Sequence, residues 1–263
     1  MFSFFVLPSQ TSKFKYTAHM NIQIITQTPD YLVLNKPAGI SVHKSGLREE
    51  YTVADWVLEN FPQAKDVGEP LTIGTGEKIQ RHGIVHRIDK ATSGALLIAL
   101  TQESYEFFKK QFKDRTVRKT YRAFLHGNWK EDQLTIQEPI GRHKKDFRKR
   151  TTEHNSRGVL KSAITFFKIL ERGMFEGEYF TLVEAQPKTG RTHQIRVHAR
   201  FMHHPVICDN LYAAKKPALL GFKRLALHAF TLEFKDTEGF THKIEAELPD
   251  DFKNAMSILE QGN

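Results

Sequence analysis

The chain has 263 residues, of which 40% are hydrophobic and 26% are charged, a composition of ordinary folded domains that excludes disorder and collagen-like structure. The formal net charge of +9 favours an anionic partner, with nucleic acid as the first candidate. The single cysteine, Cys208, excludes an internal disulfide and favours a reducing compartment, and no apolar run reaches the roughly 20 residues of a membrane helix.

The first half of the chain alternates short apolar runs with turn and helix-stop signals. Apolar alternation and continuous apolar runs predict strands at 22–24, 31–34 and 95–100. Apolar residues at helical spacing predict helices at 52–61 and 103–112. Thr52 is the expected N-cap of the first helix and Pro62 its stop, after which residues 62–80 are expected to form an irregular loop.

The second half contains more strand signals than helix signals. Aromatic and β-branched residues predict strands at 120–126, 163–170, 178–185, 225–234 and 243–248. Thr192 is expected to cap one helix, with Arg196 and Arg200 on the side opposite its apolar stripe. That stripe consists of Ile195, Ala199 and Met202. Because strands dominate and helices lie between them, we predict an α+β fold with a mixed, mostly antiparallel sheet.

Asp89 lies in a predicted loop of the kind that often carries catalytic residues. Asp89 ends the segment Ile84-Val-His-Arg-Ile-Asp89 and precedes Thr92-Ser-Gly94, so it lies between a predicted strand and a tight turn. Loops held by rigid strands often carry catalytic groups, but an aspartate here can also simply cap the turn. The residues alone leave both roles open.

A second candidate site begins the predicted helix near residue 192. Gly190-Arg-Thr-His-Gln-Ile-Arg196 gathers two arginines, a histidine and a glutamine in its first turns. The free backbone N–H groups there could hold an anion, or an arginine could pair with a carboxylate and keep it ionised. A solvated basic helix face is the structural alternative.

Residues 142–150 carry six Lys or Arg side chains and one aromatic residue, without apolar periodicity. The cations are Arg142, Lys144, Lys145, Arg148, Lys149 and Arg150. We interpret this run as a mobile loop that follows phosphates, rather than as a solubilising or targeting patch, because the whole chain is basic.

Two further patterns fail the spacing that their function requires. Residues 73–78 contain Gly-Thr-Gly but lack the phosphate-loop spacing. Several residues that can bind zinc cluster near residue 200, but none of their spacings is that of a zinc site, so no metal is expected. These residues are His198, His203, His204, Cys208 and Asp209.

Taken together, the motifs resemble those of the RluA-type pseudouridine synthases in order and kind. The resemblance rests on Leu34-Asn-Lys-Pro-Ala-Gly39, Gly83-Ile-Val-His-Arg-Ile-Asp-Lys-Ala-Thr-Ser-Gly94, Arg118-Lys-Thr-Tyr-Arg-Ala123, Gly190-Arg-Thr-His-Gln-Ile-Arg-Val-His198 and Arg224-Leu-Ala-Leu-His-Ala229. Ile88 replaces the leucine of the family pattern His-Arg-Leu-Asp, a conservative departure.

The resemblance implies a domain layout. Similarity from about Ile22 to Phe252 implies a catalytic domain at 21–255, between a loose N-terminal tail at 1–20 and a C-terminal tail at 256–263. Fewer than about 25 residues precede the first strand, too few for the S4-type RNA-binding domain that many relatives carry. The implied fold is the pseudouridine synthase fold, with a central basic cleft flanked by helices and loops.

The resemblance also implies site roles and a reaction without cofactor. Asp89 would be the catalytic aspartate, Tyr121 the active-site tyrosine and Arg196 the basic partner of the aspartate. Arg87 would enter the space left by a flipped nucleotide. His86, Arg191 and the cations of residues 142–150 would contact RNA. The carboxylate could attack the sugar or the ring, or act as a base at the sugar carbon, and the sequence does not choose between these routes.

The implied partner is structured RNA, either ribosomal RNA, tRNA or both, bound by a cytoplasmic protein that is expected to be a monomer without a membrane or obligatory protein partner. The competing class is a protein of this fold that binds or remodels RNA without turning over uridine. An Asp89 carboxylate that faces Arg196 and Tyr121 in a basic cleft would favour the enzyme.

Overall fold

The computed structural model describes residues 22–44, 50–72, 76, 78–152 and 156–261, so the predicted tail at 1–20 lies outside the described residues. Its main element is a nine-stranded sheet in the order β1-β2-β5-β13-β6-β12-β11-β7, with β14 paired to β13. These strands are β1 (Gln23–Gln27), β2 (Tyr31–Lys36), β5 (Ser93–Ala99), β6 (Arg118–His126), β7 (Gln133–Ile136), β11 (Thr165–Phe175), β12 (Glu178–Pro187), β13 (Leu227–Lys235) and β14 (Thr241–Glu245).

The sheet is mixed but mostly antiparallel, as the sequence predicts. Strand β13 runs parallel to β5, and the other pairs of neighbouring strands are antiparallel. All seven residues of β5 are buried, which explains why its sequence is a continuous apolar run rather than an alternating one. The predicted α+β class is confirmed.

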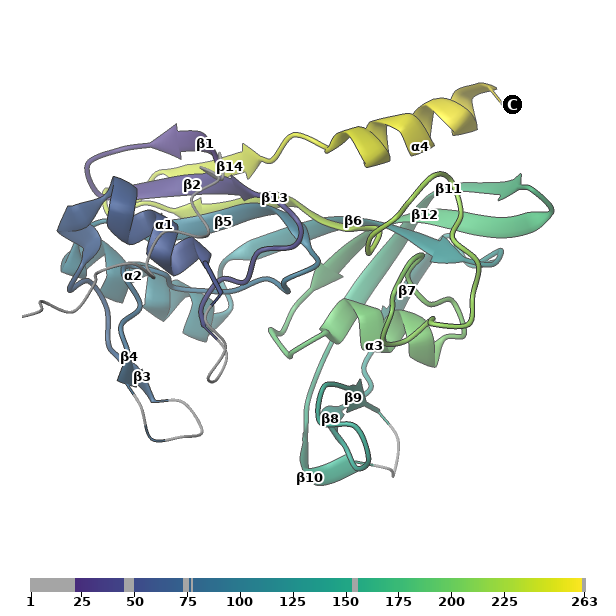
Figure 1. Cartoon of the computed structure of the whole chain (residues 1–263), viewed down its shortest axis with the longest axis horizontal. Helices are drawn as coiled ribbons and strands as arrows, with labels where there is room; N and C mark the ends of the chain where they lie inside the picture. Colours follow the sequence, from purple (N-terminus) through teal and green to yellow (C-terminus); the bar gives the residue numbers. More distant parts are fainter. Residues whose placement is uncertain (1–21, 45–49, 73–75, 77, 153–155, 262–263) are drawn as a thin grey trace, which may run out of the picture.

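Helices cover both faces of this sheet. They are α1 (Val53–Asn60), α2 (Gln102–Asp114), α3 (Gln194–Phe201) and α4 (Asp250–Gln261), with a short 3-10 helix, η1 (Pro62–Ala64), after α1. In Figure 1, α1 and α2 lie below one half of the sheet and α3 below the other half, whereas α4 lies on the opposite face. None of the described helices is long and apolar enough to cross a membrane.

Two small sheets extend from the underside of the molecule (Figure 1). One pairs β3 (Leu71–Thr72) with β4 (Lys78–Ile79), inside the segment expected to be an irregular loop. The other, which we call the basic arm, has the order β10-β8-β9 and consists of β8 (Ile140–His143), β9 (Arg150–Thr151) and β10 (Ser156–Lys161). The run at 142–150, predicted to be a mobile loop, is a loop only at 144–149, because both of its ends pair as strands.

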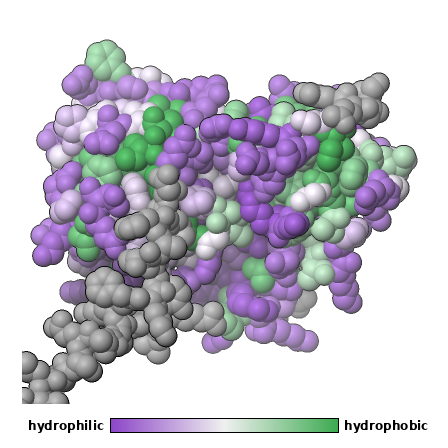
Figure 2. Space-filling view, turned by 45° about the horizontal axis from the view of Figure 1, so that its top comes forward, coloured by the Kyte–Doolittle hydropathy of each residue, from purple (hydrophilic) through white to green (hydrophobic). Residues whose placement is uncertain are grey.

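The buried side chains form two large cores, one at each half of the sheet. The first contains β2, β5, α1 and α2, and the second contains β6, β12, α3 and α4. Tyr121 on β6 packs against both cores. Hydrophobic residues reach the surface in scattered patches among hydrophilic ones (Figure 2). The junction of the two halves, where Tyr121 lies, is where the candidate site is found.

The first predicted helix begins and ends as expected. Thr52 caps α1 in a capping box, in which its hydroxyl accepts from the Asp55 amide and the Asp55 carboxylate accepts from the Thr52 amide. The cap satisfies amides that a helix start otherwise leaves without partners. The chain turns into η1 at Pro62, the predicted stop.

We expect Thr52→Ala to lower the free energy of unfolding by about 1 kcal/mol, because the capping oxygen is lost while the buried helix face is kept. Urea unfolding followed by circular dichroism measures this difference. Thr241→Ala, at an exposed position of β14, is the matched control and should change stability by less than about 0.5 kcal/mol. An equal effect of both substitutions would show that the cap contributes nothing.

The start of α3 differs from the prediction. The cap residue is His193, not Thr192, and it makes no capping hydrogen bond with its side chain. The Gln194 side chain instead fixes the turn before the helix: its Oε1 accepts from Thr189 Oγ1 at 2.6 Å and from the Arg191 amide at 3.0 Å. Arg196 is buried instead of lying with exposed Arg200 on an outer face.

The C-terminal helix was not predicted. Helix α4 continues through Gln261 and so crosses residue 255, where the sequence analysis ends the catalytic domain. Met256, Ile258 and Leu259 pack against the second core. The packed part of the chain thus includes most of the segment interpreted as a C-terminal tail.

Candidate active site

Asp89 lies in a turn whose backbone is fixed on both sides. The Thr92 amide donates to the Asp89 carbonyl at 3.1 Å, and β5 starts directly after this turn. Gly83 before the loop and Gly94 after it both have positive φ, and a Cβ at either would collide with the carbonyl oxygen of Ala99 or of Ala229. The loop is therefore clamped to β5 and β13 where only glycine fits.

A buried lysine holds the other side of the same turn. The fully buried Lys36 ammonium donates to the carbonyls of Pro37, Ile40 and Lys90, and Lys90 is the neighbour of Asp89. Burial lowers the pKa of Lys36 to about 7, while the charge of Asp89 acts in the opposite direction. The sequence pattern indicated no role for this lysine, although it lies in the motif Leu34-Asn-Lys-Pro-Ala-Gly39.

The Asp89 carboxylate is paired with Arg196 rather than only capping its turn. Arg196 Nη1 donates to Asp89 Oδ2 at 3.1 Å. The same guanidinium donates from Nε and Nη2 to the two oxygens of Asp209, at 2.7 and 2.8 Å, so one arginine joins two carboxylates. Burial alone would lower the pKa of Arg196, but Asp209 and Asp89 raise it well above its ordinary value. Arg196 therefore stays charged.

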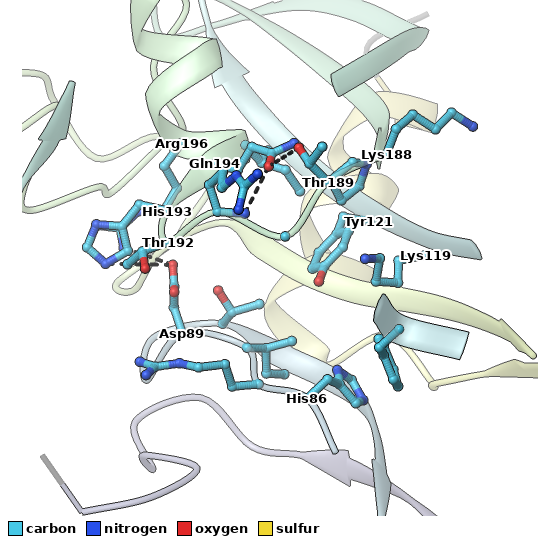
Figure 3. Close-up of a pocket in the computed structure, with 18 of the residues that line it drawn as sticks. His86, Asp89, Lys119, Tyr121, Lys188, Thr189, Thr192, His193, Gln194 and Arg196 are labelled. Carbon is cyan, nitrogen blue, oxygen red and sulfur yellow. Dashed lines mark hydrogen bonds and ion pairs between the residues drawn. The ribbon is translucent and has the colours of Figure 1, made fainter. Parts of the chain in front are cut away.

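A cavity of about 430 Å³ opens in front of Asp89. It lies between the ends of α2 and α3 and is lined by the Asp89 loop, β6 and residues 187–196. Figure 3 shows Asp89, Tyr121, Lys119 and His86 around it, with the Tyr121 hydroxyl pointing into the cavity. Burial and the Asp89 charge raise the pKa of Tyr121, so its phenol remains protonated. We call this space the active-site cavity.

His193 and Tyr212 connect this cavity with the basic arm. The Arg150 amide donates to Tyr212 Oη at 2.8 Å, and Tyr212 Oη lies 3.0 Å from His193 Nδ1. Because this hydroxyl already accepts one proton, it can donate its own to Nδ1, which leaves the His193 proton on Nε2, 4.0 Å from Asp89 Oδ2. Burial lowers the pKa of His193 to about 4, so the ring is neutral at pH 7.

The other predicted RNA contacts divide into exposed and internal side chains. Arg87 lines the cavity and is exposed, and Arg191 lines it while donating from Nε to the Ser162 carbonyl at 3.0 Å. His86 also lines it, but its Nε2 accepts from the Leu97 amide at 2.9 Å and its ring stacks on Phe112. Burial lowers the pKa of His86 to about 3, so the ring is neutral at pH 7.

The cations of the basic arm are not equivalent. Arg142 and Arg150 line a second hollow beside the active-site cavity. Arg148 is held by both oxygens of Asp146, at 3.0 and 2.9 Å. Phe147, the aromatic residue of this run, is 86% exposed.

The candidate zinc ligands near residue 200 point to separate partners. His198 bonds to Thr165 and to the Glu138 carbonyl, and His204 to the His126 carbonyl. Asp209 binds Arg196. Within the described part of the chain, no group of three or more His, Cys, Asp or Glu side chains is arranged to hold a metal ion.

Comparisons with known proteins show the family and the fold of this chain. The sequence profile described as RNA pseudouridylate synthase matches residues 30–201. The chain is 36% identical to an uncharacterized RNA pseudouridine synthase of Bacillus subtilis, YlyB, over 92% of this chain and 74% of that protein. It is 33% identical to ribosomal large subunit pseudouridine synthase C of Pasteurella multocida, over 95% and 72%.

A solved structure extends the comparison to the fold. Human RNA pseudouridylate synthase domain containing 1 superimposes with a TM-score of 0.66 and 26% identity, over 91% of this chain and 95% of that one. The class is thus an isomerase with the pseudouridine synthase fold. The chain belongs to the RNA pseudouridylate synthase family, whose members act on RNA, and the predicted resemblance is confirmed.

Proposed function

We propose that this enzyme converts uridine to pseudouridine in structured ribosomal RNA, with Asp89 as the catalytic carboxylate. The observation that carries the proposal is the Arg196–Asp89 ion pair at 3.1 Å, facing a cavity that Tyr121 also lines. Ribosomal RNA is favoured over tRNA because similar proteins of Pasteurella and Borreliella are named ribosomal large subunit pseudouridine synthases.

The reaction requires a charged carboxylate and controlled proton movement. The bond between the sugar and a ring nitrogen breaks, a bond between the same sugar carbon and a ring carbon forms, and the proton lost by that ring carbon is balanced by one gained at the nitrogen. Asp89 acts as nucleophile or as base at the sugar, and Arg196 keeps it charged and oriented. Tyr121 offers a ring for stacking on the base and a protonated hydroxyl for proton transfer.

A paired uridine must leave its helix before these groups can reach it, at a cost of a few kcal/mol. Arg87 is suited to offset this cost, because it is exposed and lines the same cavity as Asp89. Its guanidinium would occupy the space that the flipped nucleotide leaves. The basic arm would meanwhile hold phosphates of the surrounding RNA.

The direct test is to map pseudouridine in total RNA from cells with and without this gene, and then to incubate the purified protein with the identified RNA. We expect at least one ribosomal uridine to lose modification without the gene and to regain it with the pure protein. A site found only in tRNA would overturn the choice of substrate. Unchanged modification in the cell, together with no turnover by the pure protein, would overturn the catalytic function.

Substitutions in the basic arm should change RNA affinity, whereas substitution of Arg87 should change the rate at saturating RNA. Neutralising the six cations of residues 142–150 should weaken RNA binding and lower the salt slope, by roughly 0.7 to 0.9 for each phosphate that the arm no longer binds. Arg87→Ala should instead lower the rate at saturating RNA, because the flipped state is no longer held open. Saturation curves at two salt concentrations distinguish the two effects. If the arm variant kept wild-type affinity and salt slope, the arm would be only a solvated patch.

We further propose that the enzyme works without a cofactor or metal, as a cytoplasmic monomer. The bond exchange is redox-neutral, and a carboxylate at the site supplies the nucleophile or base. Turnover on prefolded RNA should therefore be unchanged by a chelator, measured as pseudouridine formed with and without EDTA. A loss of activity that zinc restores would contradict this, whereas a loss that only magnesium restores would indicate RNA folding.

A further inference from the structure

Three arginines stand in one row across the basic arm. In the antiparallel pairing of β10 with β8, Arg157 is directly opposite Arg142, and in the pairing of β8 with β9, Arg142 is directly opposite Arg150. Residues directly opposite each other in neighbouring strands point to the same face of a sheet. We call these three residues the arginine row.

Such a row is unfavourable in the free protein. Like charges directly opposite each other destabilise a pair of strands. Burial lowers the pKa of Arg150, and the positive charge of Arg142 lowers it further. An arrangement in which like charges lie opposite one another on neighbouring strands is therefore expected to bind a ligand with more than one negative charge.

The arginine row faces a hollow of about 630 Å³. Two further cations line it, Lys161 from β10 and Arg191 from the segment before α3, and none of the described residues around it is acidic. The hollow and the active-site cavity share Gly190, Arg191 and Thr192 as lining residues. A ligand in the hollow would therefore lie next to whatever occupies the active-site cavity.

We propose that this hollow binds consecutive phosphodiesters of the RNA strand next to the flipped uridine. The proposal rests on the proposed function, which brings an RNA strand to the neighbouring cavity. With neighbouring strands about 4.8 Å apart, the arginine row is about 10 Å long. Even a B-form DNA strand carries one phosphate about every 3.4 Å of helix axis, so a row of about 10 Å is long enough for more than one phosphate of a strand.

Only some cations of the basic arm line the hollow, and these are the ones expected to bind phosphate there. Arg157 and Lys161 lie outside the basic run of residues 142–150, yet both line the hollow. Lys144 and Lys149 belong to the run but are not among the residues that line it. Two pairs of substitutions therefore remove the same charge from the same arm: Arg157→Gln/Lys161→Gln inside the hollow and Lys144→Gln/Lys149→Gln outside it.

The test combines these variants with RNA in which single phosphates are made neutral. A stem–loop carrying the mapped uridine is synthesised with one methylphosphonate linkage at a time, over three nucleotides on each side of that uridine. Dissociation constants are measured for wild type and both double variants. Melting temperatures near that of wild type will show that the variants are folded.

In wild type, at least one neutral linkage should weaken binding about tenfold, the effect of losing one charged hydrogen bond. The same linkage should weaken binding less than about twofold in Arg157→Gln/Lys161→Gln, because its partner is already absent. In Lys144→Gln/Lys149→Gln the tenfold effect should persist. An equal effect in all three proteins, or no sensitive linkage in wild type, would overturn the inference.

The outcome is separable from that of the proposed function. Dissociation constants report the hollow, whereas pseudouridine formed in unmodified RNA reports the reaction. If the protein forms pseudouridine but a neutral linkage weakens binding equally in wild type and in Arg157→Gln/Lys161→Gln, only this inference is overturned. If the effect of the neutral linkage is lost in Arg157→Gln/Lys161→Gln but no pseudouridine is formed, only the proposed reaction is overturned.

Discussion

The Asp89→Asn variant is expected to form pseudouridine at least about a thousandfold more slowly than wild type while binding RNA with similar affinity. Asparagine keeps the size of the side chain and an oxygen that can accept from Arg196 Nη1. It removes the negative charge, and with it the nucleophile or base that every proposed route requires. The phosphate contacts of the basic arm are left intact.

Single-turnover rates at saturating RNA measure this loss, and a filter-binding assay measures affinity. Asp66→Asn, an exposed carboxylate of the same chain, is the matched control and should keep the wild-type rate. Arg196 retains Asp209 as a partner in the variant, so the melting temperature should change little. If the variant kept more than a few per cent of the wild-type rate, Asp89 would not be the catalytic carboxylate.

Asp89 was predictable because its signal is local. A short motif places the carboxylate between a strand and a tight turn, and the structure places it there, clamped by Gly83 and Gly94. Tyr121 was picked out by the family resemblance of the motif Arg118-Lys-Thr-Tyr-Arg-Ala123, and it lies where the two cores meet. The strands 31–34 and 95–100 were predictable because continuous apolar runs require burial, which β2 and β5 have.

The family resemblance correctly paired Arg196 with Asp89, but helical periodicity placed Arg196 on the wrong face of α3, for a general reason. Helical periodicity assigns charged residues to the solvent face, because a buried charge without a partner is costly. Arg196 is 6% exposed because it has two carboxylate partners, and one of them, Asp209, is brought to it by a loop that no periodic pattern describes. Only the tertiary fold shows that the partner exists.

The basic arm was missed for a different reason. Its strands consist largely of polar and charged residues, so they lack the apolar alternation that predicts a strand. Their pairing is carried by backbone hydrogen bonds, which any residue except proline can make. The arginine row follows from the register of this pairing, and register cannot be obtained from a run of like charges.

Replacement of Asp209 should have the second large effect, on both stability and rate. Asp209 is fully buried, with its side chain 0% exposed, and it binds Arg196 through two hydrogen bonds. It also accepts from the Leu211 and Tyr212 amides at 3.0 and 3.1 Å, and so orders the loop that carries Tyr212. We expect Asp209→Ala to lower the free energy of unfolding by about 3 to 5 kcal/mol, because a buried guanidinium loses its main partner.

Asp209→Asn distinguishes a positioning role from simple loss of folding. The amide keeps the shape and one acceptor, so most molecules should remain folded, but Arg196 loses the charge that fixes two of its nitrogens. Arg196 would then hold Asp89 less accurately, and the rate at saturating RNA should fall between about tenfold and a hundredfold. RNA affinity should stay near that of wild type, because Asp209 is buried.

The matched control is Glu233→Gln, which removes one carboxylate charge from an exposed pair with Arg118 at 3.3 Å and should change neither rate nor stability by much. Asp209 does not touch RNA in this scheme, so its effect must pass through Arg196. Combining Asp209→Asn with Asp89→Asn should therefore slow the reaction no further than Asp89→Asn alone. If the rate reduction of the double variant were the product of the two single reductions, Asp209 would act independently of the Asp89 carboxylate. Its assignment as a positioning residue would then be wrong.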